Sequence, residues 1–147
     1  MMRRSTQGTT QDSSKPIVCL VTVTTKNQVK WLANQAVHLH LRTVWQAATA
    51  WKVGRYMIMP NHIHMFAAYN ASNLTVEEWV RYWKSRFSRL HGRPELRWQP
   101  GQSTVRIRSR QSAEQKWAHM KDNPVRHGLV ENARDWPLQG EMFPIQL

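Results

Sequence analysis

Cysteine is nearly absent from this chain of 147 residues, in which Cys19 is the single example. One thiol cannot form an intramolecular disulfide and cannot build a thiolate zinc site, so both kinds of cross-link are excluded. Cys19 lies in a run of Val, Leu and Thr, where we expect it to fill a small, buried, apolar position. A chain of this length can bury a core without such cross-links, which predicts one domain.

Long hydrophobic runs are also missing, and no segment approaches the length of a transmembrane helix. The first fifteen residues are polar and basic, without the apolar stretch of a signal peptide or a membrane anchor. We therefore expect a disordered basic arm over residues 1–15 and a folded domain over residues 16–147. We also expect a cytoplasmic protein that makes no contact with a membrane.

Acidic residues are scarce, since 9 Asp and Glu face 21 Lys and Arg, which gives a net charge of +12. Such an excess repels itself in the folded state and is usually neutralised by a polyanion. Most of the arginines of the chain lie between residues 81 and 134. Aromatic residues are interleaved with them, namely Tyr82, Trp83, Phe87, Trp98 and Trp117. Cationic side chains bind phosphates and aromatic side chains stack on unpaired bases, and proteins that bind single-stranded nucleic acid combine the two. The competing interpretation is a soluble basic surface with the tryptophans in the core.

Hydrophobic periodicity predicts four strands and three helices. The predicted strands are residues 17–25, 51–58, 62–69 and 105–108, and the predicted helices are residues 31–49, 75–90 and 112–122. Thr75 and Glu78 have the spacing of a capping box, and Pro124 ends the last regular helix. The order predicts an α+β fold, the ferredoxin-like split βαβ sandwich, with a four-stranded antiparallel sheet, helices on one face and an additional C-terminal helix.

Two histidines, His62 and His64, lie two residues apart in the strand predicted after the turn at residues 59–61. Alternate side chains of a strand project to the same face, roughly 6–7 Å apart, while Ile63 and Met65 would face a core. Two such imidazoles can bind one divalent ion if a third group arrives from elsewhere in the fold. The competing interpretation is a pair of packed or surface histidines. His38 and His40 fall on different faces of a helix, and we interpret them as solvated.

Several motifs in a fixed order resemble one family. They are MPNHIH, a later WQP, RSRQSAEQKW, NPVRHGLV and DWP, and they extend from about residue 17 to residue 137. This combination is similar to the REP-associated tyrosine transposases, which belong to the single-tyrosine HUH transposases of the insertion-sequence type.

The resemblance implies a ferredoxin-like fold, a DNA substrate that is single-stranded or forms a hairpin, and DNA transposition by strand cleavage and rejoining. It also implies a divalent cation, Mg²⁺ or Mn²⁺, held by His62 and His64 with Asn123 completing the set. A tyrosine four residues before that asparagine would attack the phosphodiester, and residues at i and i+4 share a helix face. The insertion-sequence branch forms dimers and the REP-associated branch appears monomeric, so both a monomer and a homodimer stay open.

The sequence departs from this pattern at the expected nucleophile. His119 stands four residues before Asn123, and residues 102–105 read QSTV where relatives are expected to have an aromatic-Asp-His cluster. Three explanations follow: DNA binding with impaired cleavage, chemistry by His119, or replacement by another tyrosine such as Tyr82. His119 would act as a nucleophile, as a general base or as a further imidazole ligand that favours zinc.

Several residues outside the catalytic set are candidates for DNA contact. The basic candidates would bind phosphates, and Trp98 would either stack on a base or pack in the core; the set is Lys84, Arg86, Trp98, Arg106, Arg108 and Arg126. An RNA-binding or regulatory module without catalysis is the alternative from another class. Such a module would need aromatic side chains on an open face of its sheet.

Overall fold

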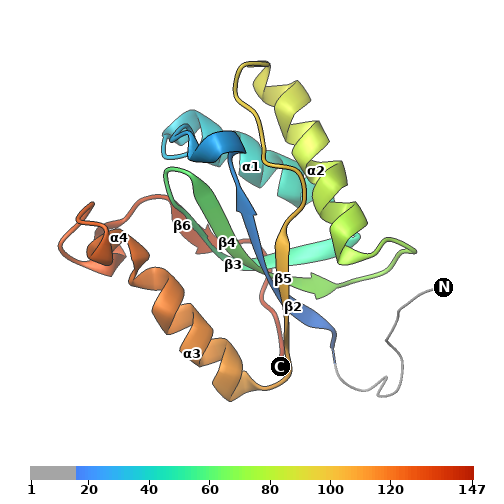
Figure 1. The fold of residues 1–147 in the computed structure, drawn as a ribbon. Helices are drawn as coiled ribbons and strands as arrows, with labels where there is room; N and C mark the ends of the chain where they lie inside the picture. Colours follow the sequence, from blue (N-terminus) through green and yellow to red (C-terminus); the bar gives the residue numbers. More distant parts are fainter. Residues whose placement is uncertain (1–15) are drawn as a thin grey trace.

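The computed structural model describes residues 16–147, so the predicted basic arm at residues 1–15 lies outside the described residues. A five-stranded antiparallel sheet has the order β5-β2-β4-β3-β6 (Figure 1). Its strands are β2 (Val18–Thr24), β3 (Trp51–Ile58), β4 (His62–Tyr69), β5 (Ser103–Ile107) and β6 (Gln139–Glu141). The first four strands confirm the split βαβ plan, and β6 adds a fifth strand that the sequence did not predict.

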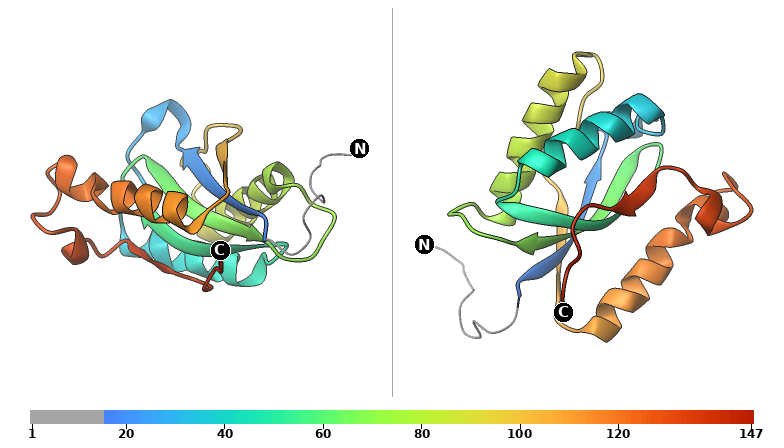
Figure 2. Two further views of the ribbon diagram at one scale, coloured as in Figure 1. Left: turned by 90° about the horizontal axis from the view of Figure 1, so that it is seen from below. Right: turned by 180° about the vertical axis from the view of Figure 1, so that it is seen from behind.

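The helices are α1 (Gln35–Ala47), α2 (Val76–His91), α3 (Arg110–Lys121) and the short α4 (Asn123–Arg126). Two 3-10 turns, η1 (Lys26–Gln28) and η2 (Ala133–Asp135), complete the elements. Helices α1 and α2 cover one face of the sheet, whereas α3 packs on the opposite face (Figure 2). None of the described helices is long and apolar enough to cross a bilayer.

The main core lies between the sheet and the pair α1–α2. Alternation along β4 directs Ile63 and Met65 into this core, as predicted, and Trp45, Trp79 and Trp83 are fully buried there. Cys19 is buried in the same cluster, and burial raises the pKa of its thiol to about 11. The prediction that Cys19 is a small apolar core residue is therefore confirmed.

A smaller apolar cluster attaches α3 to the other face of the sheet. It consists of Val18, Phe66 and Ile107 from the strands with Ala113 and Met120 from α3. Because β4 alternates, the same face that presents Phe66 also presents His62 and His64. The second layer of the fold therefore brings α3 toward the histidine pair.

Candidate functional site

The histidine pair lies at the start of β4, the central strand of the sheet. Backbone hydrogen bonds hold the turn that precedes β4. Met59 N donates to His62 O at 2.8 Å, and Thr25 N donates to Asn61 O at 3.0 Å. With Ile63 held in the core, the imidazoles of His62 and His64 both face α3, and their ring centroids are 4.8 Å apart. The predicted common projection of the two rings is confirmed.

Each ring is oriented by a hydrogen bond at Nδ1. His62 Nδ1 lies 2.7 Å from Asn61 Oδ1, and His64 Nδ1 lies 2.9 Å from the Oγ1 of Thr22, its cross-strand neighbour. An amide oxygen only accepts, so His62 carries its proton on Nδ1 and has a free lone pair on Nε2. Holding one ring nitrogen in this way is how proteins orient metal-binding histidines.

Both imidazoles are held neutral. Burial lowers the pKa of His62, and the positive charge of His127 lowers it further. Burial, followed by electrostatic coupling to His62, His119 and Arg126, lowers the pKa of His64 to about 4. A neutral imidazole is the form that binds a cation.

Helix α3 and the residues that follow it supply the opposite wall of the site. Ser109 caps α3 by accepting a hydrogen bond from Ser112 N at 3.0 Å, and α3 ends at Lys121 before Asn123 and Pro124 begin α4. A cavity of about 380 Å³ lies between α3 and the sheet. Its lining residues are Leu20, Thr22, His64, Ser112, Gln115, Lys116, His119, Met120 and Asn123.

Asn123 is buried and hydrogen-bonded at this cavity. Its Oδ1 accepts a bond of 2.7 Å from Arg126 Nη2, and the same nitrogen lies 3.5 Å from His119 Nε2. An amide oxygen has two lone pairs, so one is left for a second partner. The structure thus brings four sequence-predicted residues together, namely His64, His119, Asn123 and Arg126, with His62 directly beside His64.

These donors suit a divalent cation of the kind that the resemblance implies. Two imidazoles offer a free Nε2 each when Nδ1 donates, and the Asn123 carboxamide adds an oxygen. Within residues 16–147, however, no group of three or more His, Cys, Asp or Glu side chains is placed to hold one metal ion. His119 lines the same cavity but is not grouped with His62 and His64 closely enough to form a set of three ligands in this structure.

The tyrosines are all described, and none of them lines the cavity. Tyr82 is exposed on α2, which covers the opposite face of the sheet, and Tyr56 is fully buried in the main core. Tyr69 ends β4, at the far end of the strand from His62. Replacement of the nucleophile by Tyr82 is thus wrong, because the sheet separates this residue from the histidine pair.

The remaining candidates for DNA contact do not gather at the cavity. Arg86 is exposed on α2, on the opposite face of the sheet, and Arg108 is exposed just after β5. Arg106, on β5, is half-buried and points toward the face of Cys19. Trp98 packs against Trp31, Trp83 and Phe87, so it belongs to the core rather than to a stacking surface.

Lys84 is buried, which removes it from the phosphate-binding candidates. Its Nζ donates to the carbonyl oxygens of Gln99 at 3.0 Å and Gly101 at 2.6 Å and lies 5.9 Å from the centre of the Trp98 ring. Lys84 therefore fixes the loop that leads into β5.

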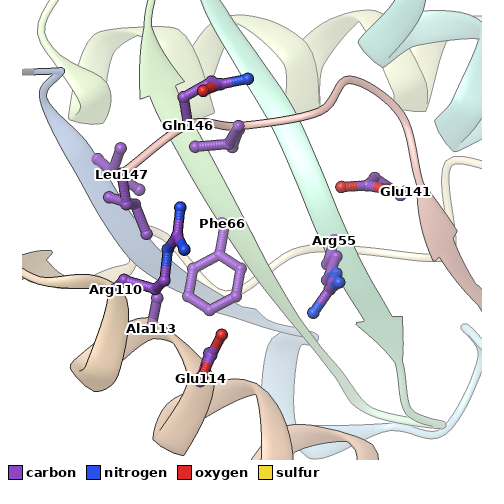
Figure 3. Close-up of a pocket in the computed structure, with 10 residues that line it drawn as sticks. Arg55, Phe66, Arg110, Ala113, Glu114, Glu141, Gln146 and Leu147 are labelled. Carbon is purple, nitrogen blue, oxygen red and sulfur yellow. The ribbon is translucent and has the colours of Figure 1, made fainter.

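A second cavity, of about 250 Å³, lies on the same face under the first turns of α3. Figure 3 shows the Phe66 ring in its middle, with Arg55 and Arg110 on opposite sides and Glu114 and Glu141 at the rim. Trp117 continues the surface, with its ring 5.4 Å from the Arg55 guanidinium. Cationic groups therefore extend along α3 from one cavity to the other.

Sequence reasoning missed Thr22, Lys116, Arg55 and Arg110. A helical spacing of three to four residues relates Ser112, Lys116, His119 and Asn123, so the cavity face of α3 was detectable from periodicity. Thr22 was not detectable, because its contact with His64 depends on the register between β2 and β4.

Fold and site together define the class: a split βαβ domain with a pair of histidines on its central strand. Two solved structures share the fold. A REP-associated tyrosine transposase bound to a REP hairpin has a TM-score of 0.72 and 21% identity, covering 84% of this chain and 75% of that chain. A protein from Deinococcus radiodurans R1, provisionally assigned as a transposase, has a TM-score of 0.54 and 13% identity, covering 82% of this chain and 97% of that chain.

Neither a scan against protein-family models nor a search of curated proteins gave a match. At these identities the structural likeness shows a shared fold. It confirms the predicted architecture and agrees with the family resemblance of the motifs.

Proposed function

We propose that this chain is a DNA-binding protein of the HUH transposase type, which holds single-stranded or hairpin DNA against the α3 face of the sheet. The cavity under α3 supports the proposal, because neutral imidazole, carboxamide and guanidinium groups meet there beside Lys116. The likeness of fold to a transposase that is bound to a REP hairpin adds support. The net charge of +12 supplies the attraction that a polyanion needs.

In the proposed complex His62, His64 and Asn123 hold Mg²⁺ or Mn²⁺. When bound, the cation polarises a phosphate oxygen and offsets the negative charge that accumulates on the phosphate. Asn61 and Thr22 keep the imidazole rings aimed at it through their Nδ1 contacts. Lys116 and Arg126 bind the neighbouring phosphates of the strand.

We further propose that cleavage is impaired. An attacking phenolate is absent, since His119 occupies the position from which a tyrosine would face the cavity. His119 stays available as a general base or as a nucleophile, with Nε2 beside the Arg126 guanidinium. We rank DNA binding without efficient cleavage first and a catalytic role of His119 second.

The alternative of an RNA-binding module gains no support from the described residues. On the α3 face, the sheet contributes Phe66 as its aromatic side chain, and the apolar contacts of α3 bury it. Base stacking on an open sheet needs exposed rings.

The test uses a labelled DNA hairpin with a single-stranded 5′ extension, incubated with Mn²⁺ and the full chain. We expect a mobility shift and no covalent adduct on a denaturing gel. The variant His119→Tyr should form a covalent protein–DNA adduct, because it restores a phenol at the cavity, and His119→Phe is the matched control without the hydroxyl. An RNA hairpin of the same sequence serves as the competitor.

Two results would count against the proposal in different ways. Failure of the wild-type chain to shift DNA, or a preference for the RNA hairpin, would overturn DNA binding. A normal shift without any adduct from His119→Tyr would overturn a nearly intact catalytic centre and leave DNA binding standing.

A further inference from the structure

A second pair of histidines lies on the opposite face of the sheet, away from the cavity. His40 is on α1, His91 is the last residue of α2, and their Nδ1 atoms are 2.9 Å apart. The ring centroids are separated by 5.1 Å, with an interplanar angle of 77°. Both side chains are half-buried, so the interpretation of His40 as a solvated group is wrong.

The surroundings favour a neutral imidazole at His91, which is the form that binds a metal ion. His91 ends α2 directly before the C-cap Gly92, where the unpaired carbonyls give the helix its negative end. Burial, followed by electrostatic coupling to His40 and Arg93, lowers the pKa of His91, and Glu95, which forms an ion pair of 2.7 Å with Arg93, opposes this shift. Phe87 stacks on His91 with centroids 5.0 Å apart and an interplanar angle of 19°.

In the present geometry a single proton forms the hydrogen bond between the two imidazole rings. Two Nδ1 atoms at 2.9 Å form a hydrogen bond only if one carries a proton and the other presents a lone pair. A metal ion can take the place of that proton and bind both nitrogens.

The geometry points to a bis-imidazole site for a transition-metal ion, Cu²⁺ or Ni²⁺, that links α1 to α2. Two nitrogens at bond lengths of about 2.0–2.1 Å are roughly 2.9 Å apart when they subtend a right angle and about 3.3 Å apart in a tetrahedron. The present 2.9 Å is close to both distances, and Cu²⁺ is the ion that nitrogen ligands bind most tightly in the first-row divalent series. Binding needs both rings to rotate, because the nitrogens now face each other along one line, and water would complete the coordination.

This site is independent of the proposed DNA chemistry. The test therefore uses the full chain carrying His62→Ala and His64→Ala, so that the first histidine pair cannot contribute. Cu²⁺ alone is the probe, with uptake measured by equilibrium dialysis and ligands counted by electron paramagnetic resonance. We expect one Cu²⁺ per chain with two equatorial imidazole nitrogens, and a rise in melting temperature of a few degrees on saturation.

Adding His40→Gln or His91→Gln to this background should weaken Cu²⁺ binding at least tenfold and remove the rise in melting temperature. Glutamine keeps a hydrogen-bonding side chain at these half-exposed positions, and circular dichroism verifies the fold. His127→Gln, an exposed histidine outside the pair, is the matched control and should leave the Cu²⁺ signal unchanged. Equal Cu²⁺ affinity in all variants, or sensitivity to only one of the two substitutions, would overturn the site.

Discussion

At the scale of single residues, the carboxamide of Asn123 has two competing partners. Arg126 donates to its Oδ1 at 2.7 Å, while the proposed cation needs the same oxygen. The oxygen has a second lone pair, but two positive charges so close together repel each other. Arg126 thus lowers the affinity for the cation while it adds affinity for DNA phosphates.

The substitution Arg126→Met separates these two effects. We expect Mn²⁺ to bind about three- to tenfold more tightly, roughly 1 kcal/mol, because the competing guanidinium is gone. Hairpin DNA should bind more weakly, because a phosphate contact is lost. Isothermal calorimetry with Mn²⁺ and fluorescence anisotropy with DNA measure the two affinities.

Arg108→Met is the control, since Arg108 is exposed outside the cavity. This variant should leave Mn²⁺ affinity unchanged. Weaker Mn²⁺ binding by Arg126→Met would mean instead that Arg126 orients Asn123 for the cation, and the idea of competition would be wrong.

At the scale of elements, Lys84 joins α2 to the loop before β5. Its ammonium satisfies the carbonyls of Gln99 and Gly101, and burial lowers its pKa to about 8. Lys84→Met keeps the length of the side chain but leaves both carbonyls without this partner. We expect the free energy of unfolding to fall by about 1–3 kcal/mol in urea denaturation.

Arg86→Met, on the exposed side of the same helix, is the matched control and should change the unfolding free energy by less than about 0.5 kcal/mol. If both variants were equally stable, the two carbonyl contacts of Lys84 would contribute nothing to stability.

Helix α1 is attached to β3 by a hydrogen-bonded cluster that should respond to pH. Arg42 Nη1 donates to the hydroxyl of buried Tyr56 at 2.6 Å, and this hydroxyl lies 2.7 Å from His38 Nε2, to which it donates when that nitrogen carries no proton. Burial, followed by the charge of Arg42, lowers the pKa of His38 below its ordinary value of 6.5. The folded protein therefore binds fewer protons at His38 than the unfolded chain does, and stability falls as the pH drops below about 6.5.

His38→Gln removes this titration but retains an acceptor for the Tyr56 hydroxyl. We expect the wild-type chain to lose more stability than His38→Gln as the pH falls below about 6.5, measured by urea denaturation at each pH. The other histidines are the same in both proteins, so only the difference between the two pH profiles reports on His38. Parallel pH profiles of the two proteins would contradict this role.

The elements also show where prediction from sequence succeeds. The boundaries of β3 and β4 were predicted to the residue, because each is an apolar run that adjoins the Pro-Asn turn, whereas the register shift between Val53 and Tyr56 was not predicted. The capping box of Thr75 and Glu78 likewise sets the start of α2. Both features depend on neighbours in sequence.

Features that depend on distant contacts were missed. Helix α1 begins at Gln35 rather than at residue 31. Trp31 and Leu32 are buried in the core but precede the helix, and Leu32 N donates a hydrogen bond to the carbonyl oxygen of Pro60. Strand β6 is three polar residues, Gln-Gly-Glu, paired with β3 by backbone alone. For the same reason the burial of Lys84 was not predicted from the sequence.

At the scale of the whole molecule, cationic side chains of residues 16–147 lie on both faces of the sheet. Arg55, Arg110, Lys116 and Arg126 lie along the α3 face, whereas Arg81, Arg86 and Arg89 are exposed on α2. Counterion release makes DNA affinity fall with salt in proportion to the number of phosphates bound, by about 0.7–0.9 logarithmic units per contact. The salt dependence of DNA affinity therefore gives the number of cationic side chains that contact DNA. Variants of each face show on which face of the sheet those side chains lie.

We expect four contacts on the α3 face, and hence a slope of log K against log salt of about −3. Affinity for a DNA hairpin should then drop roughly a hundredfold between 50 and 200 mM salt. The double variant Lys116→Gln/Arg126→Gln should reduce the slope by about 1.5–2, whereas Arg86→Gln/Arg89→Gln, which removes the same charge from α2, should leave it unchanged. Anisotropy titrations at several salt concentrations measure the slope. If the α2 variant lost the slope instead, the DNA would lie on the face of α1 and α2, and the histidine pair on β4 could not reach its phosphates because the sheet stands between them.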